Sequence, residues 1–165
     1  GDEKPRIGLS WRGGTELTRT GLRSVDVTSL AALTEHVDAT WVCLQYGDVR
    51  NDLACAAAAG LDMKYWPESI TDLDEFAALV SSLDLVVSVC NTTVHYAGAL
   101  DVPVWVLAPK VPEWRYGSAF RSMPWYPSSL MYRQETAGEW PSVVERVRSD
   151  LVAWASTRAI APTLT

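Results

Sequence analysis

The chain has 165 residues, of which 48% are hydrophobic, 21% are charged and eight are tryptophan, so it can bury a packed core and is neither disordered nor a coiled coil. Its formal net charge of −6, with no run of Lys and Arg, excludes a surface built to bind nucleic acid or an anionic membrane. No apolar segment reaches the ~20 residues of a transmembrane span, and the start, GDEKPRIGLSW, lacks the basic-then-apolar order of a signal peptide. These features predict one globular domain over residues 1–165, with an ordered core at 6–156 and a frayed tail from Thr157.

The cysteines indicate the redox compartment. Cys43, Cys55 and Cys90 are odd in number and lack CxxC spacing, and two of them lie in strand-like runs. This pattern favours reduced, buried thiols in the cytoplasm, and it predicts no zinc or other metal site. The chain also begins without methionine and almost directly at a strand, so we expect it to be one domain of a longer polypeptide.

Strand-like and helix-like segments alternate through the first half of the chain. The spacing of apolar residues and the positions of Gly and Pro predict a strand at 6–11, followed by a loop to residue 27 with a Gly13-Gly14 turn. A helix capped by Thr28 and a strand at 40–46 come next. A helix capped by Asn51 then ends at Gly60, and a strand at 63–66 ends before Pro67.

The alternation continues in the second half. A helix is predicted to begin at Thr71 or Asp72, with Leu73, Phe76, Ala77 and Val80 on one face. A strand at 84–90, a short helix at 91–100 and a strand at 102–108 follow it. After a long loop, the sequence predicts a strand at 130–134 and a closing amphipathic helix with Pro141 near its first turn. Parallel neighbours need crossover connections, so this order predicts an α/β, Rossmann-like three-layer sandwich. Its sheet is mostly parallel, with about six strands and helices on both faces.

The first candidate site lies where the strand at 84–90 meets the following helix. Asn91, Thr92 and Thr93 occupy this strand-to-helix loop, and His95 follows one turn after Thr92. A helix N-terminus presents unpaired N–H groups and a positive dipole end, so it accepts a phosphate. An equally open interpretation makes Asn91 an ordinary cap and His95 a half-buried histidine with satisfied ring nitrogens. Small residues at 97–99 predict a close approach of this helix to the sheet.

The second candidate site is the loop after the first strand. Ser10, Arg12 and Gly13 lie in SWRGGTE, where glycines allow close backbone approach and an arginine can bind phosphate through two N–H groups. A double glycine after a strand also fits an ordinary turn. GxGxxG and GxxxxGK[ST] are both absent, which removes two large nucleotide-binding classes. Gln45, at the end of the second strand, is positioned to reach a ribose hydroxyl, although simple surface polarity fits it as well.

The long loop after Pro109 is rich in aromatic residues. Trp114, Arg115 and Tyr116 predict a lid, an interface with a partner, or a cover for the sheet edge. No serine elbow or flanking carboxylate pair stands out, so the sequence assigns no catalytic residue.

Three segments carry a resemblance to a known family: DLVVSVCNTTVHYAGALDVPVWVL, IGLSWRGG upstream, and WRYG with PWYPSSLMYRQ downstream. Together they resemble the carboxyl-terminal, donor-binding half of GT-B glycosyltransferases. The closest resemblance is to the heptosyltransferase-like family 9 group, in the form found behind tetratricopeptide repeats in bacterial proteins.

The resemblance implies a domain that binds a nucleotide-diphosphate sugar as substrate, without a cofactor or protein-bound metal. It also implies a missing amino-terminal acceptor domain, with tetratricopeptide repeats in the full-length chain. The donor-binding residues carried over by position are Ser10, Arg12, Gly13, Gln45, Asn91, Thr92, Thr93 and His95. In this family the loop after the fourth strand often reads Asp-Thr-x-x-x-His. Here Cys90 stands where Asp is common, and a thiol is mostly neutral near pH 7, so sugar-hydroxyl recognition is expected to differ.

The sequence therefore leaves two functions open. One is the donor-binding domain of a glycosyltransferase, with acceptor activation supplied from outside this chain and the isolated domain inactive. The other is a non-catalytic, degenerate module that docks through the aromatic loop from Trp114 to Tyr126. A flavodoxin-like response domain needs a carboxylate cluster at the strand ends, which the sequence lacks. The nucleotide, sugar, acceptor and oligomeric state are not specified.

Overall fold

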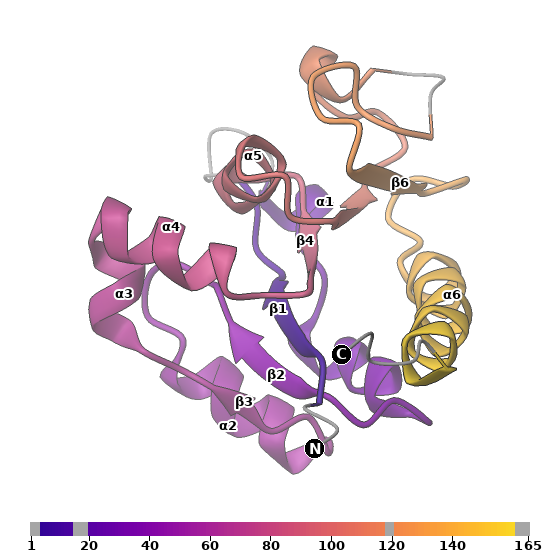
Figure 1. Ribbon diagram of the computed structural model, residues 1–165. Helices are drawn as coiled ribbons and strands as arrows, with labels where there is room; N and C mark the ends of the chain where they lie inside the picture. The colour runs from indigo at the N-terminus through magenta and orange to yellow at the C-terminus, as the bar shows by residue number, and fades with distance from the viewer. Residues whose placement is uncertain (1–3, 15–19, 118–120, 161–165) are drawn as a thin grey trace.

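A six-stranded parallel sheet forms the centre of the molecule (Figure 1). The computed structural model describes residues 4–14, 20–117 and 121–160. The strand order is β3-β2-β1-β4-β5-β6, and each neighbouring pair is parallel. The strands are β1 (Arg6–Ser10), β2 (Thr40–Cys43), β3 (Met63–Lys64), β4 (Leu85–Val89), β5 (Val104–Ala108) and β6 (Ser129–Arg133).

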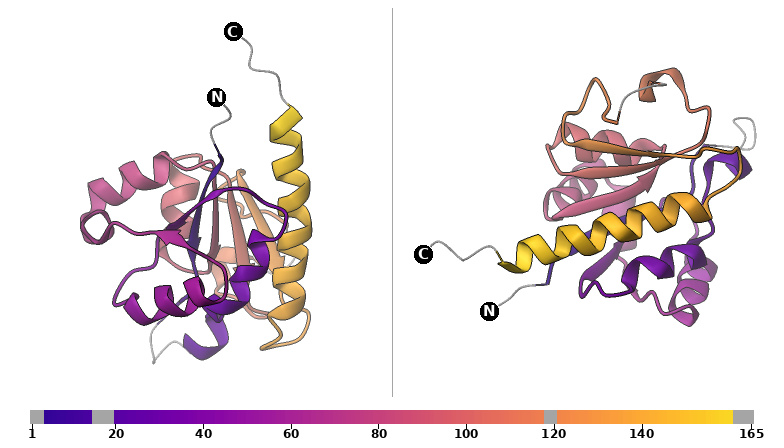
Figure 2. Two further views of the ribbon diagram at one scale, coloured as in Figure 1. Left: turned by 90° about the horizontal axis from the view of Figure 1, so that it is seen from below. Right: turned by 90° about the vertical axis from the view of Figure 1, so that its right-hand side faces the viewer.

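Helices cover both faces of this sheet, and the long last helix crosses one of them (Figure 2). The helices are α1 (Thr20–Arg23), η2 (Val27–Thr34), α2 (Arg50–Ala58), α3 (Pro67–Thr71), α4 (Leu73–Ser81), α5 (Thr92–Ala99), η3 (Trp114–Tyr116) and α6 (Pro141–Ile160), of which η2 and η3 are 3₁₀ helices. One buried core joins η2, α2 and α6 to the sheet, and a second core joins α3, α4 and α5 to the other face. The predicted three-layer α/β fold is confirmed.

The alternation of side chains along the central strands explains why both faces are covered. In β4, Leu85 and Val87 pack in the core under α6, whereas Val86 packs in the core under α5. In β5, Trp105 faces the α6 side and Val104 the α5 side. All residues of these two strands are buried, as expected for parallel strands that are apolar on both faces.

The strand order places the site. The chain winds outward from β1 through β2 to β3, then returns to the other side of β1 as β4. The carboxyl ends of β1 and β4 therefore diverge at a topological switch point, where open α/β sheets bind ligands. The loops that follow these two strands carry the two candidate sites expected from the sequence.

Two predicted helix caps are wrong. Asp26, not Thr28, caps the first predicted helix: its Oδ1 accepts the N–H of Thr28 at 2.9 Å, and the element is a 3₁₀ helix. Asn51 lies inside the first turn of α2, which begins after Val49. In both cases an aspartate nearer the start of the helix takes the capping role, because its carboxylate accepts the backbone N–H two residues later. At α2, Asp48 Oδ1 accepts the N–H of Arg50 at 3.1 Å.

Other boundaries also differ from the prediction. Asp72 caps α4 as expected, with its Oδ1 accepting the N–H groups of Asp74 and Glu75. Leu73, however, is exposed and does not join the buried face of that helix. An additional short helix, α3, precedes it because Pro67 is well suited to the first helical turn.

The carboxyl-terminal helix is longer than expected. Fraying was predicted from Thr157, but α6 continues to Ile160, and the rest of the predicted tail lies outside the described residues. Arg158 holds the end of the helix to the sheet through an ion pair with Asp84 at 2.5 Å. No helix in the described parts of the chain combines the length and the apolar character that a membrane crossing requires.

Gly98 fits against an aromatic loop rather than against the sheet. A Cβ at this position would lie 2.3 Å from Cγ of Tyr126. The small residues of α5 were expected to let the helix approach the sheet; Ala97 does so, whereas Gly98 makes room for the loop that follows β5.

We expect Gly98→Ala to lower the free energy of unfolding by about 1–3 kcal/mol through overpacking, although alanine normally stabilises a helix. Urea denaturation measures this change. Gly21→Ala is the matched control, because a Cβ there meets no atom within 4 Å. Equal stability of the two variants would contradict the close packing of Tyr126 on α5.

Candidate functional site

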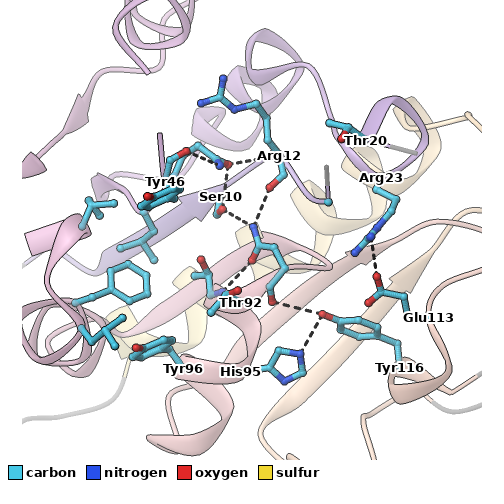
Figure 3. Close-up of a pocket in the computed structure, with 18 of the residues that line it drawn as sticks. Ser10, Arg12, Thr20, Arg23, Tyr46, Thr92, His95, Tyr96, Glu113 and Tyr116 are labelled. Atoms are coloured by element: carbon cyan, nitrogen blue, oxygen red, sulfur yellow. Dashed lines mark hydrogen bonds and ion pairs between the residues drawn. The ribbon is translucent and has the colours of Figure 1, made fainter. Parts of the chain in front are cut away.

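A cavity of about 780 Å³ opens at the switch point between β1 and β4 (Figure 3). We call it the switch-point cavity. Its walls come from the loops after β1, β2, β4 and β5 and from α3, α4 and α5. The lining residues are Ser10, Arg12, Gly14, Thr20, Arg23, Leu44, Gln45, Tyr46, Ile70, Thr71, Leu73, Phe76, Asn91, Thr92, Thr93, His95, Tyr96, Glu113, Arg115 and Tyr116.

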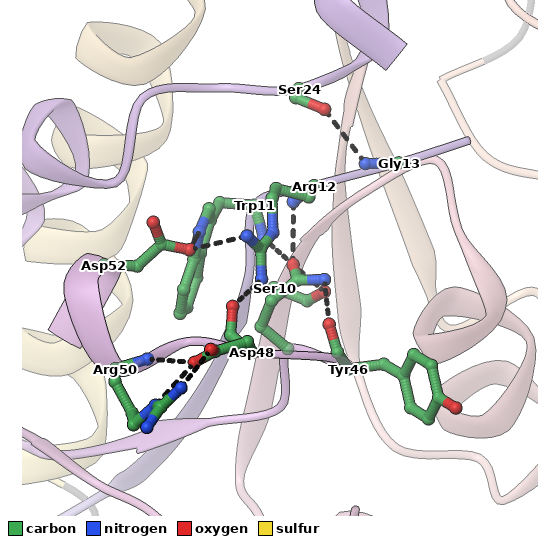
Figure 4. A network of polar contacts seen from close by, with 10 residues as sticks. Ser10, Trp11, Arg12, Gly13, Ser24, Tyr46, Asp48, Arg50 and Asp52 are labelled. Atoms are coloured by element: carbon green, nitrogen blue, oxygen red, sulfur yellow. Dashed lines mark hydrogen bonds and ion pairs between the residues drawn. The ribbon is translucent and has the colours of Figure 1, made fainter. Parts of the chain in front are cut away.

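Gln45 holds the backbone of the loop after β1. Its Oε1 accepts the N–H groups of Trp11 at 3.0 Å and Arg12 at 2.7 Å, and the hydroxyl of Ser10 at 3.1 Å (Figure 4). Its Nε2 donates to the carbonyl of Tyr46. Gln45 is only 5% exposed. These contacts show that Gln45 shapes the loop after β1, whereas its predicted contact with a ribose stays a prediction.

Asn91 joins the two strand ends across the switch point. Its Nδ2 donates to Ser10 Oγ at 2.7 Å and to the carbonyl of Arg12 at 3.1 Å. Its Oδ1 accepts the N–H of Thr93 at 3.0 Å and so caps α5. Three predicted site residues, Ser10, Gln45 and Asn91, thus form one hydrogen-bonded chain between the loops after β1, β2 and β4.

The tip of α5 faces the cavity. Thr92 is exposed there, whereas Thr93 is buried behind it. The side chain of Asn91 satisfies the N–H of Thr93, and helix geometry leaves the other N–H groups of the first turn without partners further back in the helix. The tip therefore presents a positive end to the cavity, as predicted, with one of its donors already used.

Arg12 is placed differently from the expected phosphate clamp. Its guanidinium pairs with Asp52 at 3.1 Å and donates to the carbonyl of Asp48 at 2.9 Å (Figure 4). Trp11 Nε1 donates to the same Asp52 oxygen at 3.0 Å. These contacts direct the guanidinium toward α2 but leave some of its five N–H groups, and Arg12 still lines the cavity, so a phosphate contact by Arg12 stays a prediction.

Gly13 does not line the cavity but allows its walls to meet. A Cβ on Gly13 would lie 2.9 Å from the carbonyl oxygen of Cys90 and 3.2 Å from that of Arg23. The loop after β1 therefore passes directly against the end of β4. The glycine permits this close approach between backbone segments, whereas its predicted contact with a donor stays a prediction.

His95 lies between two tyrosine hydroxyls on the cavity wall. Its Nδ1 is 3.3 Å from Tyr126 Oη, and its Nε2 is 3.5 Å from Tyr116 Oη. Tyr116 Oη also lies 3.4 Å from the carbonyl oxygen of Asn91 and donates to it. Burial, followed by the positive charge of Arg115, lowers the pKa of His95. The histidine is thus favoured in its neutral form and ties the aromatic loop to α5.

Cys90 points away from the cavity. Its thiol is buried in the core under α5, where it lies 3.9 Å from the carbonyl oxygen of Leu107, and burial raises its pKa to about 12. The Cys90 thiol is therefore not placed to contact sugar hydroxyls in the cavity directly. All three cysteines are free, with Cys43 and Cys90 buried as predicted and Cys55 exposed.

A group of charged residues that the sequence reasoning missed lies beside the α5 tip. Arg23 pairs with Glu113 at 2.6 Å and donates to the carbonyl of Cys90 at 3.0 Å. Arg115 pairs with the other oxygen of Glu113 at 3.3 Å. Arg23 follows the loop after β1, and Glu113 and Arg115 follow β5, so only the fold brings Arg23 to the other two. The one feature of the sequence that could have pointed to these residues is that they follow the carboxyl ends of strands, where ligands bind in such sheets.

The opposite end of the cavity is apolar and was also missed. Phe76 and Tyr96 pack edge to face, with ring centroids 4.9 Å apart. Tyr46 lines the same cavity with 73% of its surface exposed, and Figure 3 shows it on the same side of the cavity as Tyr96. Ile70 and Leu73 complete this end. The exposure of Leu73, which contradicted the predicted helix face, is explained by its place on the cavity wall. Within the described residues, no group of three His, Cys, Asp or Glu side chains is arranged to hold a metal ion.

Replacing Gln45 with Leu should destabilise the loop after β1, because two buried N–H groups lose their acceptor. We expect the free energy of unfolding to fall by about 1–3 kcal/mol. Amide hydrogen exchange should accelerate at Trp11 and Arg12, whereas the N–H of Leu44, which bonds to the carbonyl of Leu9, serves as the internal control. Unchanged exchange at Trp11 and Arg12 would refute the contacts of Gln45.

The lowered pKa of His95 predicts a pH-dependent stability. A group whose pKa is lower in the folded chain than its usual 6.5 binds protons more weakly when folded, so its contribution weakens as pH falls through and below about 6.5. Acidification from pH 8 to pH 5 should lower Tm more in the wild type than in His95→Gln. Identical pH profiles of Tm for the two proteins would show that His95 does not titrate differently on folding.

No protein-family model matches the chain. The chain is similar to protein FlbA from Caulobacter vibrioides, with 32% identity over 158 residues that cover 93% of this chain. It spans only 26% of the length of that relative. Among solved structures, it is similar to the E. coli heptosyltransferase WaaC with ADP-2-deoxy-2-fluoro heptose, at a TM-score of 0.56 and 14% identity, over 90% of this chain and 44% of that one. The structural likeness shows that the chain has an α/β, Rossmann-like fold that matches one half of a GT-B glycosyltransferase fold.

Proposed function

We propose that the chain is the donor-binding domain of a glycosyltransferase and that the switch-point cavity holds a nucleotide-diphosphate sugar. The observation that carries this proposal is the position of the α5 tip, which opens into the cavity where the strand order reverses. Helix N-termini at such positions bind phosphate through backbone N–H groups and the helix dipole. The fold shared with a heptosyltransferase, whose structure carries an ADP-sugar, supports the same assignment.

The two ends of the cavity suit the two ends of a nucleotide. Tyr46, Phe76 and Tyr96 form an aromatic, apolar end, on which a base can stack. Thr92 and Arg115 lie at the polar end, close to the α5 tip. The volume of about 780 Å³ falls within the range of small-molecule sites. The cavity therefore matches a ligand with an aromatic base and a charged diphosphate.

The local charge favours an anion although the chain as a whole is acidic. The charged side chains that line the cavity are Arg12, Arg23, Arg115 and Glu113. Arg12 pairs with Asp52, so Arg23, Arg115 and Glu113 leave a surplus of one positive charge beside the α5 tip. In a chain of formal charge −6, this surplus concentrates an anionic ligand at the tip rather than elsewhere.

The geometry supports a transfer in which the protein stabilises the departing diphosphate. The α5 tip and the nearby arginines would neutralise the charge that develops on the leaving group, without a protein-bound metal. Acceptor contacts and a general base would come from polypeptide outside residues 1–165: an amino-terminal acceptor domain, with tetratricopeptide repeats and a bacterial cytoplasmic setting as the resemblance implies. His95, fixed by two tyrosines, would orient the loop that closes this end of the site.

One observation favours the second function, a docking module without catalysis. Trp114 and Trp125 are 78% and 59% exposed and pack against each other with ring centroids 6.4 Å apart. Exposed, clustered tryptophans are typical of binding surfaces. The two functions differ in one measurable respect: sugar transfer by the longer polypeptide that contains this domain would exclude the purely docking function.

Calorimetric titration with ADP, GDP, UDP and CDP tests the donor-binding proposal. We expect at least one nucleotide to bind, and Tyr46→Ala to weaken its binding about ten-fold through lost base stacking. Trp125→Ala is the matched control, because this exposed aromatic residue does not line the cavity.

Binding of a nucleotide that is weakened equally by both variants would place the base elsewhere. If the wild-type protein binds none of the four nucleotides or their sugar conjugates, the donor-binding proposal is wrong. The docking function would then be the better account of the domain.

A further inference from the structure

Glu113 lies between the two arginines that border the α5 tip. One oxygen of its carboxylate is 2.6 Å from Arg23 Nη1, and the other is 3.3 Å from Arg115 Nη2. All three side chains line the switch-point cavity. Figure 3 shows the ion pair of Arg23 and Glu113 on its wall. The carboxylate therefore occupies N–H donors that would otherwise face an anionic ligand.

The two arginines differ in how firmly they are held. The side chain of Arg23 is only 14% exposed, and its Nη2 also donates to the carbonyl of Cys90 at the end of β4. Arg115 is 41% exposed, and Glu113 is the carboxylate with which it pairs. Arg23 is thus a fixed cation attached to the site, whereas Arg115 is free to turn once its partner leaves.

The ion pair also separates two cavities. Arg23 and Glu113 line a second cavity of about 460 Å³, whose other walls include Lys110, Val111 and Gln134. If the Glu113 side chain turns toward this second cavity, it leaves Arg115, which lines only the switch-point cavity, whereas Arg23 lines both. Lys110 and Gln134 are polar side chains on the wall that it would then face. The Glu113 carboxylate can therefore move into the second cavity by rotation of its side chain, without unfolding of the loop after β5.

We propose that Glu113 is a built-in counter-ion for Arg23 and Arg115, which the diphosphate of the donor displaces on binding. Arg23 and Arg115 are then phosphate-binding residues of this domain, and Glu113 sets how tightly the phosphates are held. This inference rests on the proposed donor-binding function and deepens it. A carboxylate and a phosphate compete for the same guanidinium groups, and the negative charge of Glu113 also repels the incoming anion.

The test compares Glu113→Gln with Glu139→Gln, which removes the same charge from an exposed residue that lines neither cavity. Calorimetric titrations use the nucleoside diphosphate that binds the wild-type protein, inorganic pyrophosphate and the corresponding nucleoside. Glu113→Gln should bind the nucleoside diphosphate and pyrophosphate about three- to ten-fold more tightly than Glu139→Gln, whereas nucleoside binding should be the same. Arg23→Gln should weaken both phosphate-bearing probes.

Two results would overturn the proposal while leaving donor binding intact: equal affinities of Glu113→Gln and Glu139→Gln for pyrophosphate, or tighter binding of the nucleoside as well. Binding of no nucleotide by any variant would reject the counter-ion together with the proposed function. If Glu113→Gln fails to fold, Glu113→Asp replaces it, since the shorter carboxylate cannot span both arginines. An intermediate gain in pyrophosphate affinity then supports the counter-ion, and no gain refutes it.

Discussion

The hydrogen bonds of the Asn91 side chain are the interaction on which the site depends. This one amide caps α5 through the N–H of Thr93 and joins the end of β4 to Ser10 and Arg12 at the end of β1. Parallel strands diverge at a switch point, so some bond must hold their ends at a fixed separation there. Asn91 does so from the residue that also starts the helix. The cavity, the orientation of the helix tip and the position of the loop after β1 all follow from this bond.

The same bond limits what can hold a ligand. Ser10, Gln45 and Asn91 satisfy one another, and Arg12 is paired with Asp52, so the polar side chains that appear most suited to a phosphate are largely occupied. In the proposed site, recognition of an anion rests on the remaining N–H groups of the helix tip and on Arg23 and Arg115 from other loops. This division of labour is common in α/β sites, because groups that shape a site must be rigid and satisfied, while groups that bind must have donors to offer.

The sequence predicted much of what is encoded locally, although the two caps at Thr28 and Asn51 were wrong. The apolar strands and the Asn91 cap were readable because each depends on neighbours within a few residues. The Arg23–Glu113–Arg115 group was not readable, since its members are up to 92 residues apart and meet only through the parallel order of the sheet. Cys90 shows the same limit: its place at the family's Asp position predicted a change in sugar-hydroxyl recognition, but the alternation of β4 directs its side chain into the core. The ion pair of Arg12 was not readable either, because Asp52 lies on a later helix; a phosphate contact by Arg12 stays a prediction.

The central claim is that the backbone of the α5 tip binds the phosphates of a nucleotide. Chemical-shift mapping of the ¹⁵N-labelled domain during titration with nucleoside diphosphates tests it most directly. The account predicts that the largest amide shifts occur at Thr92, Thr93 and Val94 and in the loop after β1. Shifts confined to the second cavity, at Gln134, Ala137 and Gly138, or a spectrum that no nucleotide changes, would contradict it.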